Sequence, residues 1–363
     1  DSGSGIAEGK PCILETAGTA TQVSASGTGL GTPVVFETAT SNYTSATFDS
    51  DSNKVVIAYK DVGNSGHGTA IVGTVSGTAI SYGTAVVFEA ATSNYISTTF
   101  DSDSNKVVIA YQDAGNSNYG TAIVGTVSGT SITFGTPVVF IANGAFNTPA
   151  ITFDSTNNKI VIAYTLSGTG GFGIVGTVSG TSISFGTPVA ISGATPTYTS
   201  ITYDANTDRV VASYRDAANS DYGTSAVGTV SGTSISWGTP VVFETANAQY
   251  SSSTYDSDAN KVVISYQDYP NSQYGTAIVG TVSGTSISFG TAVVYESAEI
   301  TWNSATFDSN INKVVIAYKD VGNSGYGTTI VGTVSGTAIS FSDPEVFESA
   351  ATAYCAATFD SNS

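Results

Sequence analysis

Short apolar runs separated by polar clusters divide the chain into strand-length segments. Residues 54–59 (Lys-Val-Val-Ile-Ala-Tyr) are apolar on both faces, so a strand here must be covered on both sides. We expect further strands at 42–49, 69–75 and 79–89, with Gly83 interrupting the last. No segment shows a helical apolar period with caps, and Val, Ile, Thr, Tyr and Phe dominate, which is strand composition. The pattern predicts an all-β protein.

This pattern returns about every 52 residues, which is typical of an array of equal structural units. The phrase Gly-Thr-[Pro/Ala]-Val marks the period, and it starts at Gly31, Gly83, Gly135, Gly186, Gly238 and Gly290, with a degenerate copy at Ser342. Short connections make neighbouring strands antiparallel. Four-stranded antiparallel units that bury both faces against identical neighbours describe a β-propeller. A β-solenoid is the alternative, although its repeats are usually shorter and its ends need caps.

The number of units predicts how the ring closes. Six complete units span 42–89, 94–141, 146–192, 197–244, 249–296 and 302–348. Residues 354–363 then supply one more first strand, and 10–37 supply the three strands that it lacks. We therefore predict that residues 1–363 form a single seven-bladed β-propeller. A composite blade of three N-terminal strands and one C-terminal strand closes it and removes open sheet edges.

Cys12 and Cys355, the only cysteines, stand at opposite ends of the chain. The composite blade places them on adjacent strands, so we predict a disulfide between them. Two buried thiols, or a bond to a second chain through an exchanged strand, are the alternatives.

The formal charge of −18, from 10 Lys and Arg against 28 Asp and Glu, argues against nucleic acid and anionic membranes as partners. The chain contains no run of eighteen apolar residues, so we predict no membrane insertion. The chain contains no Met, which we interpret as a mark of processing or excision from a longer protein. We expect an extracellular, cell-surface or virion location.

Five units carry a polar motif, Asp-x-x-Asn-Ser, in the loop between their second and third strands, and an aromatic follows in most copies. These side chains could bind a sugar, because carboxylates and amides bond hydroxyls and an aromatic packs on the sugar ring. Alternatively, Asp and Asn cap the loop backbone and Tyr packs between units, which the repetition favours. The candidate ligand-binding residues are Asp61, Asn64, Asp113, Asn116, Tyr119, Asp216, Asn219, Tyr222, Asp268, Asn271, Tyr274, Asp320, Asn323 and Tyr326.

The loops that enter each unit, on the same face, add acids and aromatics. They comprise Glu37, Glu89, Glu244, Glu296 and Glu348, with Tyr43, Tyr95, Tyr198, Tyr250 and Tyr354. Trp302 replaces one of these tyrosines and is of interest as an exposed aromatic. The third unit differs from the others, because Ile141 replaces the Glu and Leu166 replaces the motif Asp.

Asp-x-Asp-x-Asn at 49–53, 101–105 and 256–260 resembles the start of a calcium loop. However, Lys54 stands where that loop needs Gly, and no Glu follows at its twelfth position. We interpret these segments as hairpin turns and predict no metal and no cofactor.

The chain lacks several of the residue combinations that known catalytic mechanisms need. His67 is the only histidine, which removes His-based triads and multi-His metal sites. Arg209 and Arg215 are the only arginines, too few for the arginine cluster of a sialidase. A carboxylate pair for glycoside hydrolysis stays open, because acids are plentiful. We predict that the chain is not an enzyme.

The string at 106–130, which recurs in most units, resembles the tandem propeller repeats of marine phage and bacterial surface or virion structural proteins. The resemblance implies a structural, adhesive or receptor-facing role. We therefore predict a non-enzymatic display or adhesion module, with surface glycans or neighbouring structural subunits as partners. The alternative is a multivalent, lectin-like glycan-binding module whose weak sites gain by avidity. A glycoside hydrolase is the third hypothesis.

Overall fold

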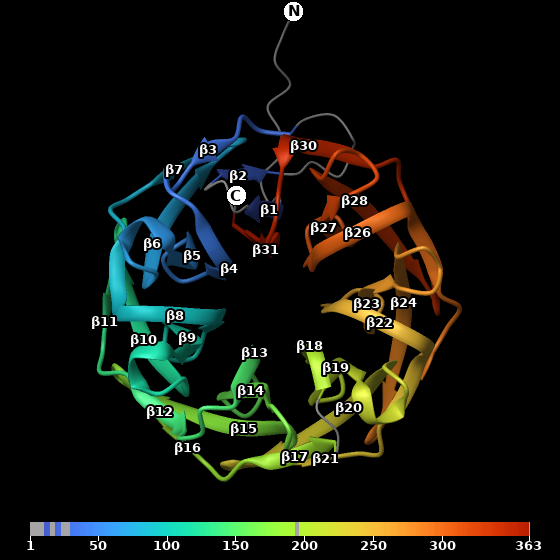
Figure 1. The fold of residues 1–363 in the computed structure, drawn as a ribbon, viewed down its shortest axis with the longest axis horizontal. Coiled ribbons are helices and arrows are strands. Elements are labelled where there is room, and N and C mark those ends of the chain that lie inside the picture. Colours follow the sequence, from blue (N-terminus) through green and yellow to red (C-terminus); the bar gives the residue numbers. More distant parts are fainter. Residues whose placement is uncertain (1–10, 15–18, 23–29, 193–195, 363) are drawn as a thin grey trace, which may run out of the picture.

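The computed structural model is a ring of antiparallel sheets arranged radially around a central axis (Figure 1). It describes residues 11–14, 19–22, 30–192 and 196–362, with the backbone alone at 11–14, at 19–22 and at 192. Apart from three single-turn 3-10 helices, every regular element in this part of the chain is a strand. No helix in these ranges is long and apolar enough to cross a membrane. The predicted all-β, propeller-like architecture is confirmed.

The innermost strand of each unit lies nearest the axis. Three of these strands are separate elements, namely β4 (Ser41–Asp49), β13 (Phe146–Asp154) and β18 (Pro196–Asp204). Three others continue without a break from the outer strand of the preceding unit, namely β8 (Val86–Asp101), β22 (Val241–Asp256) and β26 (Val293–Asp308). The chain therefore passes directly from the rim of one sheet to the centre of the next.

The second strand of each unit is almost wholly buried, as its two apolar faces predict. Val55, Val56, Ile57, Ala58 and Tyr59 have no exposed surface. The second strands are β5 (Lys54–Asp61), β9 (Lys106–Asp113), β14 (Lys159–Leu166), β19 (Arg209–Asp216), β23 (Lys261–Asp268) and β27 (Lys313–Asp320).

The third strand pairs with the second and carries the outer edge of the sheet. The third strands are β6 (His67–Ser76), β10 (Tyr119–Ser128), β15 (Gly170–Ser179), β20 (Tyr222–Ser231), β24 (Tyr274–Ser283) and β28 (Tyr326–Ser335). Three 3-10 turns lie between second and third strands, namely η1 (Val62–Asn64), η2 (Ala114–Asn116) and η3 (Ala217–Asn219).

The predicted outer strand is two short strands on either side of the repeated glycine, and both pair with the third strand. The first pieces are β7 (Ala79–Tyr82), β11 (Ser131–Phe134), β16 (Ser182–Phe185), β21 (Ser234–Trp237), β25 (Ser286–Phe289) and β29 (Ala338–Phe341). The second pieces are the beginnings of β8, β22 and β26, together with β12 (Val138–Ile141), β17 (Val189–Ser192) and β30 (Glu345–Ala351). At the break, Gly83 N donates to Val72 O at 2.9 Å.

The two ends of the chain share one sheet. The last strand, β31 (Ala356–Phe359), pairs antiparallel with β1 (Pro11–Leu14), and β2 (Thr19–Gln22) and β3 (Val34–Val35) follow outward. The neighbouring unit is also in contact, because the Asn362 side chain donates to Ser50 O at 3.1 Å.

The backbone register of this sheet bears on the predicted disulfide. Cys12 pairs with Thr358, three residues along the chain from Cys355, which lies just before β31. The Cys12 side chain lies outside the described residues, and no disulfide is found among the side chains that are described. The bond therefore stays a prediction.

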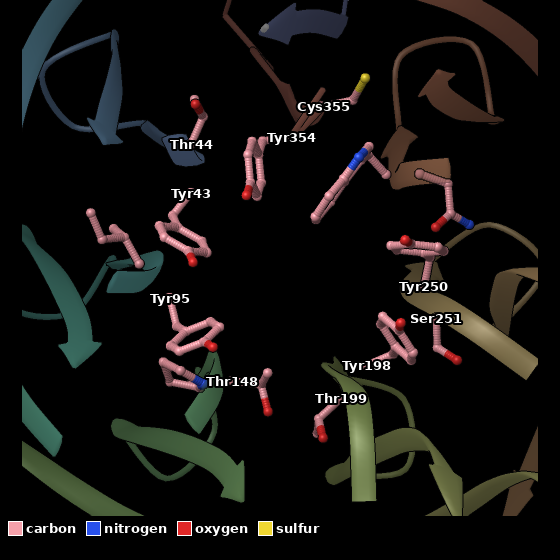
Figure 2. Close-up of a pocket in the computed structure, with 14 residues that line it drawn as sticks. Tyr43, Thr44, Tyr95, Thr148, Tyr198, Thr199, Tyr250, Ser251, Tyr354 and Cys355 are labelled. Atoms are coloured by element: carbon pink, nitrogen blue, oxygen red, sulfur yellow. The ribbon is translucent and has the colours of Figure 1, made fainter. Parts of the chain in front are cut away.

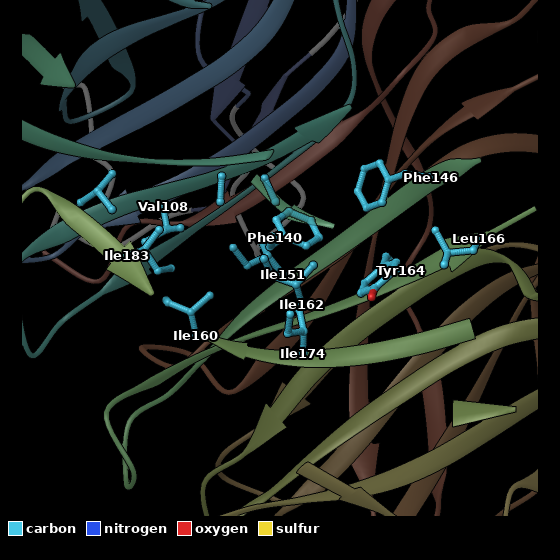
Figure 3. Packing of buried hydrophobic residues seen from close by; sticks show 13 residues of the cluster. Val108, Phe140, Phe146, Ile151, Ile160, Ile162, Tyr164, Leu166, Ile174 and Ile183 are labelled. Atoms are coloured by element: carbon cyan, nitrogen blue, oxygen red, sulfur yellow. The ribbon is translucent and has the colours of Figure 1, made fainter. Parts of the chain in front are cut away.

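The hydrophobic core lies between neighbouring sheets. In Figure 3, Val108 of β9 belongs to the same cluster as Ile160 and Ile162 of β14, one unit further along. Serine side chains near the axis add bonds between the units, because Ser45 Oγ accepts from Thr98 N at 3.0 Å. The equivalent bonds run from Ser253 N to Ser200 Oγ, from Ala305 N to Ser252 Oγ and from Ala357 N to Ser304 Oγ.

The repeated glycine lies against the next unit, which explains its recurrence. A Cβ on Gly135 would overlap the carbonyl oxygen of Thr181, in the turn between β15 and β16. The same overlap would occur between Gly83 and Thr130. Because the obstacle is backbone, no side-chain rotation relieves it, and only glycine allows the sheets to approach this closely.

Replacing one of these glycines should loosen the ring. We expect Gly135→Ala to lower the free energy of unfolding by about 1–3 kcal/mol, because the added methyl forces two sheets apart. Ser131→Ala, at an exposed position of β11, is the control and should leave stability nearly unchanged. Urea unfolding followed by circular dichroism measures both, and equal midpoints for the two variants would contradict the close-approach argument.

Candidate functional site

A cavity of about 470 Å³ lies on the axis, near the beginnings of the inner strands. Each of seven successive inner segments contributes two consecutive residues to its wall (Figure 2). These residues are Tyr43, Thr44, Tyr95, Ile96, Thr148, Pro149, Tyr198, Thr199, Tyr250, Ser251, Trp302, Asn303, Tyr354 and Cys355. Among the described residues, the wall contains no carboxylate and no imidazole, so it offers aromatic faces and hydrogen-bonding groups to a ligand.

In six of the seven segments, a β-bulge turns the first residue of the pair toward the axis. Between the pairs Asn42–Lys60 and Ser45–Ala58, two residues of β4 oppose the single residue Tyr59. Tyr43 at this bulge adopts φ 53°, a left-handed conformation that bulky side chains rarely occupy. The same positive φ recurs at Tyr95, Thr148, Tyr198, Tyr250, Trp302 and Tyr354. Every unit therefore holds the corresponding residue in the same strained conformation.

Six of these seven side chains are aromatic and form a continuous arc. Ring centroids are 5.0 Å apart for Tyr95 and Tyr43, 5.1 Å for Tyr43 and Tyr354, and 4.1 Å for Tyr354 and Trp302. The arc continues from Trp302 to Tyr250 at 5.2 Å and from Tyr250 to Tyr198 at 4.7 Å. Neighbouring ring planes are inclined to each other by 42–57°, so adjacent rings pack in a tilted arrangement.

Cationic side chains support the outer edge of the arc. Lys60 Nζ lies 5.8 Å from the ring centroid of Tyr43, and Arg215 Cζ lies 5.5 Å from that of Tyr198. Lys60 also donates to Asn94 Oδ1 at 2.9 Å, and Arg215 forms an ion pair with Asp221 at 3.5 Å. These contacts hold the rings in place from outside the cavity.

The hydroxyls of Tyr43 and Tyr250 stay protonated over the whole neutral range. Burial, together with the neighbouring hydroxyls of Tyr354 and Tyr95, raises the pKa of Tyr43 to about 12. Burial likewise raises the pKa of Tyr250 to about 12. These groups can therefore both donate and accept hydrogen bonds at physiological pH.

The loop motif predicted to bind sugar lies at the same end of the ring, outside the cavity wall. Asp61 Oδ1 accepts from Asn64 N at 3.0 Å, and Asp113 and Asp320 accept from Asn116 N and Asn323 N at 3.0 Å. Asp216 accepts from Ala218 N at 3.1 Å, and Asn271 donates to Asp268. The carboxylates thus cap the loops, as the alternative interpretation expected.

The other motif residues are more accessible than the capping carboxylates. Asn64, Asn116, Asn219, Asn271 and Asn323 are exposed. Each motif aromatic is half-buried and pairs across the sheet with its own Asp, namely Tyr119 with Asp113, Tyr222 with Asp216, Tyr274 with Asp268 and Tyr326 with Asp320. Whether these loops bind a ligand stays a prediction.

The glutamates of the entering loops bond to buried tyrosines of the second strands. Tyr111 Oη donates to Glu89 Oε2 at 3.1 Å, and the pairs Tyr59–Glu37, Tyr266–Glu244 and Tyr318–Glu296 repeat the contact at 3.2, 3.0 and 3.0 Å. In the third unit Ile141 replaces the glutamate, and the Tyr164 hydroxyl has no partner among the described residues. These glutamates are parts of the fold.

At the opposite end of the ring, the Asp-x-Asp-x-Asn segments form hairpin turns. Asp49 Oδ1 accepts from the backbone N of Asp51 and Ser52, and its Oδ2 accepts from Ser52 Oγ. Within the described ranges, no group of three His, Cys, Asp or Glu side chains could hold a metal ion. A second cavity of about 530 Å³ lies at this end, and every inner strand contributes a Thr followed by Phe or Tyr to its wall.

The sequence predicts the arc residues in the loops that enter each unit. The structure places five of them inside the inner strands, where the bulge directs them inward, and Tyr354 just before β31. One aromatic at the same position of nearly every unit was the available signal. The direction of these side chains depends on the bulge, which turns a side chain toward the axis without changing the distance in sequence from one unit to the next.

The comparisons with known proteins establish the fold alone. No protein-family model and no curated protein sequence matches the chain. Among solved structures, a periplasmic gluconolactonase from Pseudomonas aeruginosa matches with a TM-score of 0.67 and 11% identity, covering 96% of this chain and 98% of its own. The lectin BP39L from Burkholderia pseudomallei matches with a TM-score of 0.67 and 11% identity, covering 94% and 96%. A β-propeller domain of Cps50 from Myceliophteria thermophila matches with a TM-score of 0.60 and 8% identity, covering 89% and 93%.

These matches correct one prediction from the sequence. The prediction that the chain is not an enzyme is wrong, because a gluconolactonase has the same fold along nearly its whole length. The missing His and Arg sets exclude particular mechanisms, but the ring architecture carries both lactonases and lectins.

The tyrosine–glutamate contacts give a prediction with an internal control. We expect Tyr111→Phe to lower the free energy of unfolding by about 1–3 kcal/mol, because Glu89 loses a donor in a half-buried site. Tyr164→Phe removes a hydroxyl that has no partner among the described residues, and it should leave stability unchanged or slightly higher. Urea midpoints measure both, and equal losses in the two variants would contradict the assignment.

The glutamates also predict the pH dependence of stability. Burial raises the pKa of Glu89, Glu244 and Glu296 in the folded chain above the ordinary value. A raised folded-state pKa contributes stability that is present below the unfolded pKa and is lost as pH rises through the folded value. We therefore expect the melting temperature to fall between pH 4.5 and pH 7, as followed by calorimetry.

The large negative charge of the chain acts in the same direction, so a matched control is needed. A variant with all three of these glutamates changed to Gln should show a clearly smaller fall. Asp51→Asn, Asp103→Asn and Asp258→Asn together remove the same charge from exposed positions. An equal reduction of the fall in both triple variants would show that net charge, rather than burial, causes the dependence.

Proposed function

We propose that this protein is a lectin-like, carbohydrate-binding β-propeller and that its axial cavity is the sugar site. The observation that carries the proposal is the arc of six aromatic side chains, each at positive φ, around one cavity. Such backbone conformations cost about 1–3 kcal/mol each for residues other than glycine. Glycine or Asn would relax this strain, so the bulky rings occupy these positions against local preference.

The chemistry of the wall suits a sugar. One face of a pyranose ring carries C–H groups that pack on an aromatic face, while its hydroxyls need donors and acceptors. The arc supplies both kinds of contact, because Tyr43 and Tyr250 present rings together with protonated hydroxyls. A cavity of about 470 Å³ is within the range of small-ligand sites.

The finer features of the fold belong to the same proposal. We assign the ring seven blades, the seventh being the sheet of β1, β2, β3 and β31. The pairing of β1 with β31 and the seven residue pairs around the cavity support this assignment. An extracellular or surface location suits a glycan-binding role, with the exposed loop asparagines as an outer set of contacts.

The two tryptophans allow a direct test. Trp302 belongs to the arc, and Trp237 is in an outer strand, where it packs beside Gly173. In a Trp237→Phe variant, Trp302 is the only tryptophan, and its emission should change saturably when a sugar binds. Trp302→Ala should raise the Kd at least about tenfold, and Trp302→Tyr, which restores the repeat, should keep binding.

A glycan array of the purified wild-type chain supplies the ligands for this titration. Array binding without any change in Trp302 emission would move the site to the outer loops. Absence of binding to every glycan on the array would overturn the proposed function.

A further inference from the structure

The arc of aromatic rings is open on one side. Figure 2 shows Thr148 between Tyr95 and Tyr198, at the position that an aromatic occupies in the other six segments. Thr148 has the same left-handed backbone, with φ 43°, so the bulge is kept and only the ring is missing. Its hydroxyl lies 3.4 Å from Thr165 Oγ1, directed at its own sheet.

In the same unit, the loop between the second and third strands, beside this opening, is also short. Only residues 167–169 separate β14 from β15, whereas 114–118 separate β9 from β10. Thr169 N donates to Leu166 O at 2.9 Å, which closes this loop as a single tight turn. The penultimate residue of the second strand, beside the arc, is Thr165, whereas longer side chains such as Lys60 and Arg215 stand there in other units.

The rest of this unit follows the repeat, so its departures from the repeat are not spread over the whole unit. Ile160, Val161 and Ile162 are fully buried, as their equivalents are. At the opposite end, Asp154 Oδ1 still accepts from the turn, and Thr152 and Phe153 still line the second cavity. The departures from the repeat gather at one end of one sheet, beside the cavity.

We propose that the gap at Thr148 is a lateral exit, through which an oligosaccharide leaves the cavity with its terminal sugar held on the aromatic arc. This inference rests on the proposed function and names the ligand class as the end of a glycan chain. A closed ring of seven aromatics would enclose a single sugar and leave only the axial direction free. With Thr148 in place of a ring, the second and third sugars can lie over the short loop at 167–169.

The test closes the gap with the residue that the repeat itself uses. Wild type, Thr148→Tyr and Thr148→Ala are titrated with mono-, di-, tri- and tetrasaccharides of the sugar best bound on the array. Wild type should gain at least about tenfold in affinity from mono- to trisaccharide, and Thr148→Ala should keep this gain. Thr148→Tyr should lose the gain, so that its affinity for the trisaccharide stays within about twofold of its own affinity for the monosaccharide.

The outcomes separate this inference from the proposed function. If wild type binds sugars but shows no gain with length, or if Thr148→Tyr keeps the gain, the lateral exit is wrong and the axial site stands. If no sugar binds wild type, both fall together. A thermal melt of each variant is the check on folding, and Thr148→Val, whose side chain is as small as that of threonine, should also keep the gain with glycan length.

Discussion

The six sheets whose second strands are described with side chains are buried on both faces, and this constraint governs the rest of the structure. The second strands have no exposed surface over five consecutive residues, so each sheet needs a neighbour on either side. A closed ring satisfies this need without capping units. The repeated glycine sets how closely neighbours approach, because the next backbone would collide with any Cβ there.

The rigidity of these interfaces lets the inner strands hold an unfavourable backbone. Tyr43 and its equivalents sit at bulges that face the axis, while the residue opposite the bulge, such as Tyr59, is locked in the core. Strain at the axis is therefore sustained by packing further out. The binding surface that we assign to the arc is preorganised by the same interfaces that stabilise the fold.

The period and the buried second strands could be read from the sequence, because both follow from the spacing of apolar residues. The direction of the arc aromatics could not, since a bulge with positive φ at Tyr43 leaves the spacing unchanged. The Asp-x-x-Asn-Ser motif could be found in the sequence, but its two interpretations, sugar binding and capping of the loop, differ only in the geometry of the side chains. Asp113 caps its own loop, and a single sequence does not distinguish a capping carboxylate from one that faces a ligand.

The sheet that joins the two ends has a consequence for folding. Pro11 pairs with Phe359, so this contact closes a loop of nearly the whole chain, whereas each complete unit makes its own contacts within about 50 residues. The entropy lost on closing a loop grows with its length, and high contact order slows folding. Local pairings within each unit should therefore form early, and we expect the joining of β31 to β1 to be the late, slow step of folding.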